Sequence, residues 1–158
     1  MSATGIRIID AGPQHVEAML ALLPRLADYD IPPSRDARDL WRHDEALLRQ
    51  WQAGNADCIV HVAVDANDEV VGLSLVRLRA ELLSGAPSAH LEALALDKRA
   101  EGKGIAQALL QRAEEASLAQ GAGSMTLHVF AVNRRARKLY ERAGYDGELM
   151  RYIKHLDA

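Results

Sequence analysis

The sequence is poor in cysteine and aromatic residues, with one cysteine, one phenylalanine and two tryptophans among its 158 residues. A single cysteine, Cys58, excludes an intramolecular disulfide and a four-thiolate metal site, and it is typical of a reducing compartment. The sequence also lacks any apolar run near the ~18 residues of a membrane span. Its first residues lack the basic and apolar regions of a signal peptide. We therefore expect a cytoplasmic protein without a membrane partner.

Neither sign of charge is in large excess, because 19 Lys and Arg stand against 22 Asp and Glu, for a net charge of −3. This balance argues against a nucleic-acid partner. The six histidines are scattered without an i,i+4 pair, so no metal site is expected. Hydrophobic residues make up 49% and charged residues 26% of the chain. That composition excludes intrinsic disorder, and the length favours one domain over residues 1–158.

The spacing of apolar residues alternates between helical and extended patterns. Helical spacing predicts helices over about residues 14–26, 40–51, 105–120 and 133–143, the first of them kinked near Pro24. Alternating or β-branched runs predict strands over residues 6–9, 58–64, 69–78, 91–96, 125–130 and 149–156. This order mixes hairpins with crossovers, and it therefore predicts an α/β domain with a mixed sheet.

The strongest local signal is a glycine-rich turn between a predicted strand and the predicted helix at residues 105–120. Gly102 and Gly104 let the backbone approach a ligand without obstruction by a Cβ atom. The first N–H groups of the helix have no intrahelical partner and lie at the positive end of its dipole, so they suit a phosphate. Lys103 adds a cation beside them. A turn of the same sequence that binds no ligand is the alternative interpretation.

Residues 91–110 resemble the acetyl-CoA-binding segment of the GNAT superfamily of N-acetyltransferases. That segment follows a strand, precedes a helix and reads (Q/R)-x-x-G-x-(G/A), which aligns with residues 101–106. Gly104 and Ala106 match the pattern, whereas Glu101 replaces the usual Arg or Gln. A carboxylate at this place predicts weaker phosphate binding, or compensation by Lys103.

A second segment, residues 132–145, is similar to the other cofactor segment of that family, N-x-x-A-x-x-L-Y-x-x-x-G-F. Asn133 is the expected N-cap of its helix, and Gly144 is expected to end it. With both segments in order, the resemblance covers essentially the whole chain. It implies a GNAT-like fold, with a central mixed sheet of six or seven strands flanked by about four helices.

The resemblance further implies acetyl-CoA as cosubstrate and no metal. Tyr140 would protonate the departing thiolate, whose thiol has a pKa of roughly 8.5. Glu92 would serve as the base for the acceptor amine, with His90 as a second candidate. The alternatives are a tyrosine that packs in the core and a carboxylate at an exposed strand end. The residues expected to bind the cofactor are Leu94, Leu96, Glu101, Gly102, Lys103, Gly104, Ile105, Ala106, Asn133 and Tyr140.

The implied reaction is acetyl transfer to a primary amine of a small molecule by direct attack. The loops at Tyr29–Asp39 and Leu82–Ser88 are expected to line the acceptor pocket. A protein acetyltransferase acting on lysine or an N-terminus is one alternative. A non-catalytic acyl-CoA-binding regulatory domain is another, and Glu101 gives it weight. The acceptor, the acyl length and the oligomeric state stay open, with a homodimer among the options.

Overall fold

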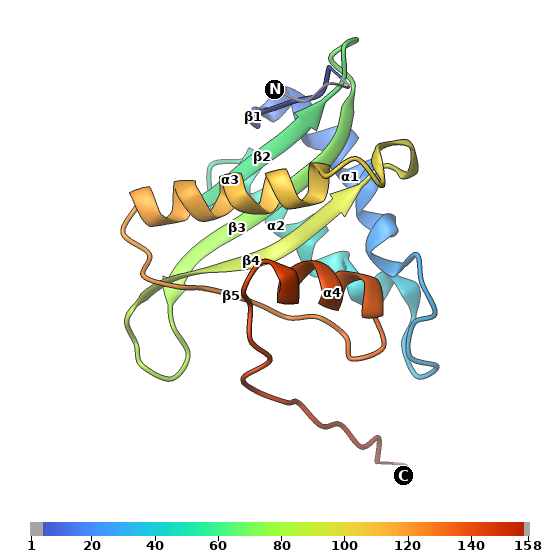
Figure 1. Cartoon of the computed structure of the whole chain (residues 1–158), viewed down its shortest axis with the longest axis vertical. Coiled ribbons are helices and arrows are strands. Elements are labelled where there is room, and N and C mark those ends of the chain that lie inside the picture. The colour runs from blue at the N-terminus through green and yellow to red at the C-terminus, as the bar shows by residue number, and fades with distance from the viewer. Residues whose placement is uncertain (1–4, 157–158) are drawn as a thin grey trace.

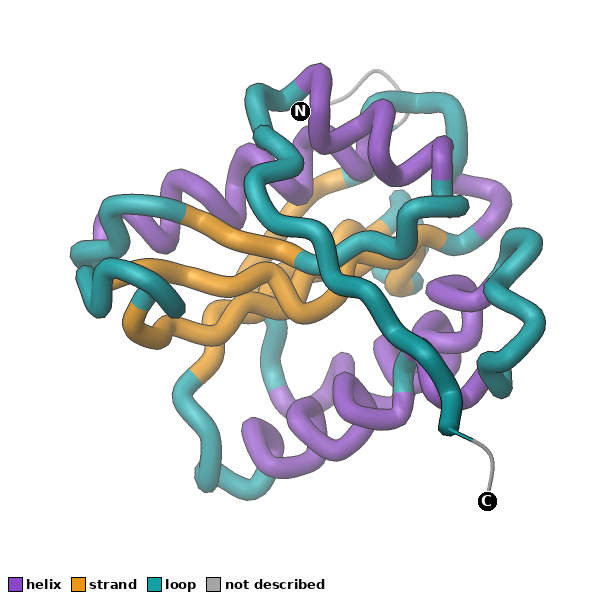
Figure 2. Tube along the Cα trace, turned by 90° about the horizontal axis from the view of Figure 1, so that it is seen from below, coloured by secondary structure: helices purple, strands orange, loops and turns teal. Residues whose placement is uncertain are grey.

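The structure is a computed structural model that describes residues 5–156, and it has three layers (Figures 1 and 2). The middle layer is a sheet with the strand order β1-β2-β3-β4-β5. Strands β1 to β4 are antiparallel to one another in sequence order, and β5 runs parallel to β4. The predicted mixed sheet is therefore confirmed. The strands are β1 (Arg7–Asp10), β2 (Cys58–Val64), β3 (Val70–Ala80), β4 (Pro87–Leu96) and β5 (Met125–Leu127).

Helices cover both faces of the sheet (Figure 2). One face carries α1 (Val16–Leu22) and α2 (Arg42–Gln52), and the other carries α3 (Ile105–Ala119) and α4 (Arg134–Arg142). Helix α1 gives way to a 3₁₀ helix at Leu23, one residue before Pro24, because proline removes an N–H and clashes with the preceding turn. The short 3₁₀ helices are η1 (Pro13–His15), η2 (Leu23–Ala27), η3 (Ala37–Leu40) and η4 (Lys98–Ala100).

The two faces of the sheet bury separate sets of apolar side chains. Leu73 and Leu75 of β3 pack with α1 and α2. Leu91 of β4 packs instead with Leu110 and Ala113 of α3. The small alanine side chain lets α3 lie close to the sheet, as expected for a helix with a narrow apolar stripe. Among the described residues, no helix is both long and apolar enough to cross a membrane.

The sheet differs from the sequence prediction at its last strands. It has five strands in the described chain instead of six or seven, and β5 ends at Leu127 instead of residue 130. The predicted strand at residues 149–156 is absent, and Tyr152 within it is 84% exposed. Alternation and β-branching indicate only that a segment can be extended. A strand also needs a neighbour that accepts its hydrogen bonds, and no described segment pairs with residues 149–156.

Candidate functional site

The ladder between β3 and β4 contains a bulge at Glu92. Two consecutive residues of β3, Val76 and Leu75, pair with Leu91 and Ala93 of β4. Glu92 is therefore the extra residue. Such a bulge bends the strand and re-aims a side chain, and bulges are over-represented next to active sites. Burial and then the charge of Glu92 raise the pKa of Asp44, a residue of α2, to about 7. The Glu92 carboxylate therefore lies on the face of the sheet that α2 covers.

Strands β4 and β5 separate at the same place. Their parallel ladder ends at Leu91, and from Glu92 to Leu96 strand β4 pairs with β3 alone. The Asp97 N–H donates to a β3 carbonyl at 2.8 Å. Because main-chain groups alternate in direction along a strand, Leu94 and Leu96 point theirs to the open edge. An extended ligand with amide groups can pair with such an edge as an added strand.

The glycine-rich turn connects this open edge to α3. Gly102 and Gly104 have φ of +74° and +76°, in the left-handed region that favours glycine, and a Cβ at either would meet no atom within 4 Å. Gly104 is also the N-cap of α3, and no side chain caps that helix. The first N–H groups of this 15-residue helix are therefore available to a ligand. The Ile105 side chain is only 3% exposed.

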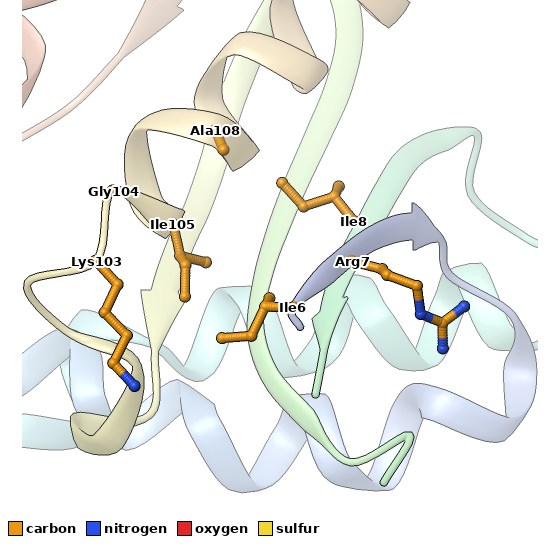
Figure 3. Close-up of a pocket in the computed structure, with 7 residues that line it drawn as sticks. All are labelled: Ile6, Arg7, Ile8, Lys103, Gly104, Ile105 and Ala108. Carbon is orange, nitrogen blue, oxygen red and sulfur yellow. The ribbon is translucent and has the colours of Figure 1, made fainter. Parts of the chain in front are cut away.

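A cavity of about 330 Å³ borders the turn on the side that faces β1 (Figure 3). Its walls are mostly apolar, and the Ile6, Ile8 and Ile105 side chains project into it. The Lys103 side chain lies at its margin. Neither Glu92 nor Tyr140 lines this cavity, so it is separate from the open edge of β4.

The Glu101 carboxylate, whose side chain is 25% exposed, lies between two guanidiniums. Its Oε2 atom is 2.7 Å from Arg135 on α4 and 3.1 Å from Arg25 on η2. Arg25 also donates from Nε to the Leu96 carbonyl at 3.0 Å. Glu101 thus joins the turn after β4 to α4 and to the end of the α1–η2 segment. The sequence pattern identified Glu101 as a departure, but it gave no sign of its two partners.

Helix α4 carries Tyr140 on the side that packs toward α3. Burial raises the pKa of Tyr140 to about 12, and its ring meets Tyr145 edge to face with centroids 5.9 Å apart. Within residues 5–156 the Tyr140 hydroxyl has no hydrogen-bond partner. The Asn133 side chain accepts from the Ala136 N–H at 3.3 Å, which confirms the predicted N-cap. Gly144, with φ of +96°, follows the end of the helix as predicted.

His90, the second candidate base, is buried where β4 and β5 are still paired. Its Nδ1 lies 2.8 Å from the Thr126 hydroxyl, and its ring lies 4.8 Å from that of His128. Burial, followed by the charges of Arg79 and His128, lowers the pKa of His90 to about 4. The imidazole is therefore neutral at neutral pH and a weak base.

Asp44 was missed by the sequence analysis. Its side chain is only 7% exposed, and within the described chain it has neither a hydrogen bond nor an ion pair. A signal was present, because Asp44 falls among Leu40, Leu47 and Leu48 on the apolar face of the predicted helix. A lone acid on a buried helix face is uncommon unless it is paired or functional.

The two loops expected to line an acceptor pocket do not face each other. The loop that joins β3 to β4, which includes residues 82–86, lies on the opposite side of the molecule from residues 29–36 in both views (Figures 1 and 2). The loop at residues 29–36 lies between η2 and η3, just before α2, which carries Asp44. Burial raises the pKa of Tyr29 in this loop, and its buried hydroxyl oxygen has no hydrogen-bond partner among residues 5–156. Only this loop remains a candidate wall of an acceptor site.

Comparison with known proteins identifies the family of this arrangement. The family model "Acetyltransferase (GNAT) family" matches residues 23–145, which include the bulge, the glycine turn and α4. The chain belongs to the GNAT family of acetyltransferases. Members of this GNAT family use acetyl-CoA as cosubstrate. The resemblance inferred from the two sequence segments is therefore confirmed.

Individual relatives agree with this assignment. The chain is 34% identical over 90 residues to Uncharacterized N-acetyltransferase YdgE of Bacillus subtilis, and the match spans 57% of each protein. A putative acetyl transferase from Pyrococcus furiosus superposes with a TM-score of 0.75 at 23% identity, over 96% of this chain and 99% of that one. A ribosomal-protein-alanine N-acetyltransferase from Brucella melitensis superposes with a TM-score of 0.70 at 19% identity, over 96% and 99%. At these identities the two solved structures establish the GNAT fold alone.

Proposed function

We propose that this GNAT protein is an N-acetyltransferase that transfers an acetyl group from acetyl-CoA to a primary amine of a small molecule. The observation that carries the proposal is the position of Glu92. The bulge presents this carboxylate at the point where β4 and β5 separate and where β4 acquires an open edge. One place therefore offers both a proton acceptor and a backbone surface for the donor.

The described residues fit acetyl-CoA. The main-chain groups of Leu94 and the N–H of Leu96 suit the amides of its extended arm, whereas the Leu96 carbonyl already accepts from Arg25. The N–H groups from Gly102 to Ala106, at the uncapped start of α3, suit its phosphates. Asn133, also expected to bind the cofactor, already uses its side-chain oxygen as a helix cap. When bound, acetyl-CoA supplies an activated acyl group on a thiol leaving group.

Glu92 accepts the proton that the acceptor must lose. An ammonium has no lone pair, so the amine attacks only after this deprotonation. Burial and then the charge of Glu92 raise the pKa of Asp44 to about 7, which keeps Asp44 largely protonated below neutral pH. Because Asp44 is then neutral, Glu92 carries the negative charge of the pair and attracts the cationic acceptor. A C–N bond forms, the C–S bond breaks, and the released proton stays with the carboxylates or passes to water.

Tyr140 assists departure of the thiolate. Its pKa of about 12 keeps the phenol protonated at neutral pH, so a proton is always present to donate. A buried donor without another partner stabilises charge that develops on sulfur more than a solvated donor does. The nitrogen loses a second proton as the amide forms, and a proton taken up from water restores the phenol after Tyr140 has protonated the sulfur, which leaves as a thiol. The proposal therefore uses Glu92 as base and Tyr140 as acid.

A panel of amines tests this proposal when thiol release from acetyl-CoA is measured for the wild-type protein and for Glu92→Gln. We expect release with at least one small primary amine. We also expect the variant to lose most of its rate below neutral pH, where the acceptor is almost fully protonated. Release only with lysine peptides or protein N-termini would indicate a protein acetyltransferase instead. CoA binding without turnover on any acceptor would indicate a regulatory domain.

A further inference from the structure

Three charged residues from distant parts of the sequence meet beside the open edge of β4. Arg25 comes from η2, Glu101 from the turn before α3 and Arg135 from the first turn of α4. Both guanidiniums contact the same carboxylate oxygen, at 3.1 Å for Arg25 and 2.7 Å for Arg135. Strands β4 and β5 separate beside this cluster. The Glu101–Arg135 pair links the turn between β4 and α3, on one side of the separation, to α4 on the other side. Glu101 belongs to the turn that leads into the uncapped start of α3, so the pair and that helix start share one turn.

The two arginines are held very differently. The Arg25 side chain is 24% exposed, and it is fixed by the Leu96 carbonyl and by Asp28 in addition to Glu101. The Arg135 side chain is 73% exposed, and in the described chain Glu101 is its only ion-pair or side-chain hydrogen-bond partner. Exposed ion pairs contribute little to stability and are screened by salt. Arg135 can therefore leave Glu101 at small cost, whereas Arg25 cannot.

We propose that Arg135 leaves Glu101 and binds a phosphate group of the acyl donor instead. Arg25 keeps its ion pair with Glu101 and so neutralises the Glu101 carboxylate. This assignment rests on the proposed function and names two residues that neither the family pattern nor the comparisons identify. It makes the protein selective for phosphate-bearing acyl donors over the bare thiol arm.

The chemistry of Arg25, Glu101 and Arg135 supports separate roles for the two arginines. A guanidinium presents paired N–H donors that match a phosphate as well as a carboxylate, so Arg135 can exchange one anionic partner for the other and keep its paired hydrogen bonds. Glu101 would then be an unpaired carboxylate next to the phosphate if Arg25 were absent. The unusual Glu101 is therefore compatible with donor binding only because Arg25 is fixed beside it. Arg25 is accordingly a positioning residue, and Arg135 is the ligand-binding one.

Calorimetric binding of two probes, CoA and pantetheine, tests the assignment, since pantetheine lacks every phosphate. We expect Arg135→Ala to weaken CoA binding by about tenfold and to leave pantetheine binding unchanged. The control is Arg142→Ala, at the other end of α4, which should leave both affinities unchanged. Equal CoA affinity in Arg135→Ala and wild-type protein would overturn the role of Arg135.

A double-mutant cycle tests Arg25. We expect Arg25→Ala alone to weaken CoA binding about tenfold, because Glu101 then repels the phosphates. Glu101→Gln should tighten CoA binding, and adding Arg25→Ala to Glu101→Gln should have no further effect. A loss in the double variant equal to that in Arg25→Ala would show a merely structural role and overturn this part.

Arg135→Ala alters an exposed group, and Glu101→Gln keeps the size of the side chain, so both variants remain informative if Arg25→Ala does not fold. A wild-type protein that binds neither CoA nor pantetheine would contradict the proposed function itself. CoA binding that responds to none of the three substitutions would contradict only the present assignment.

Discussion

Helices α3 and α4 flank the separation between β4 and β5, yet they are built in opposite ways. Helix α3 buries five residues, including Leu109 and Leu110, whereas none of the residues of α4 is fully buried. The N-terminus of α3 has no side-chain cap, whereas Asn133 caps α4. The chain thus satisfies the start of α4 with its own side chain, whereas no described side chain caps the start of α3. We infer that α3 is the rigid wall beside the separated strands β4 and β5, and that α4 is the adjustable one.

The means of attachment support this comparison. Helix α3 lies against the sheet through apolar contacts with β4 and its neighbours. Helix α4 is attached through the rings of Tyr140 and Tyr145, and through the exposed ion pair of Arg135 with Glu101. Tyr145 adds a 2.6 Å hydrogen bond from its hydroxyl to Glu114 of α3. Few buried apolar contacts and an exposed ion pair are typical of segments that open at low free-energy cost.

The largest expected effect is on stability, from truncation of the buried face of α3. Leu109→Ala should lower the free energy of unfolding by about 2–5 kcal/mol, because Leu109 is fully buried and its removal leaves a cavity. Chemical denaturation measures this loss. The matched control is Leu118→Ala on the same helix, where the side chain is 71% exposed and the cost should be small. Equal losses in the two variants would contradict the view of α3 as the rigid wall.

The next largest effect concerns chemistry on α4. Tyr140→Phe keeps the ring and its packing but removes the proton, so kcat should fall by roughly 10²-fold. The KM for acetyl-CoA should change little, because the hydroxyl acts once charge develops on sulfur. Steady-state kinetics measure both constants, with Tyr152→Phe, an exposed tyrosine, as control. If Tyr140→Phe kept the wild-type kcat, Tyr140 would have a packing role and would not act as the acid.

A smaller effect is expected at the uncapped start of α3. Gly104→Val places side-chain bulk where phosphate approaches the backbone, and CoA affinity should fall at least tenfold, or about 1.4 kcal/mol. Valine also strains a backbone with φ of +76°, so stability falls as well. Gly54→Val is the matched control, because Gly54 has φ of +79° and equally open surroundings at the end of α2. Calorimetry should show weakened CoA binding for Gly104→Val alone.

Local signals predicted much of this arrangement from the sequence. The glycine turn, the start of α3, the Asn133 cap and Gly144 all depend on a few neighbouring residues, and each is where it was expected. Register and partnership are not local. That Glu92 is the bulge residue depends on which residues of β3 lie opposite, and hydrophobic alternation does not specify this.

The same limit applies to charges that meet only in the folded chain. Glu101 was interpreted as weakening phosphate binding because the family pattern has Arg or Gln at its place, with Lys103 as possible compensation. Its actual partners, Arg25 and Arg135, come from segments far away on either side. The absent strand at residues 149–156 shows the same limit, since extended propensity cannot supply a partner. Asp44, by contrast, was visible as an acid on an apolar helix face.

The smallest expected effect is at the start of α4, which Asn133 caps. Asn133→Ala removes the acceptor for the Ala136 N–H and should cost about 1 kcal/mol. Because α4 is attached weakly, the loss should appear as faster hydrogen exchange confined to its first turn, with little change in α3. Asn55→Ala, at an exposed asparagine after α2, is the control and should change neither helix. If exchange in α3 rises together with that in α4, the two walls unfold as one unit, and α4 is not the adjustable wall.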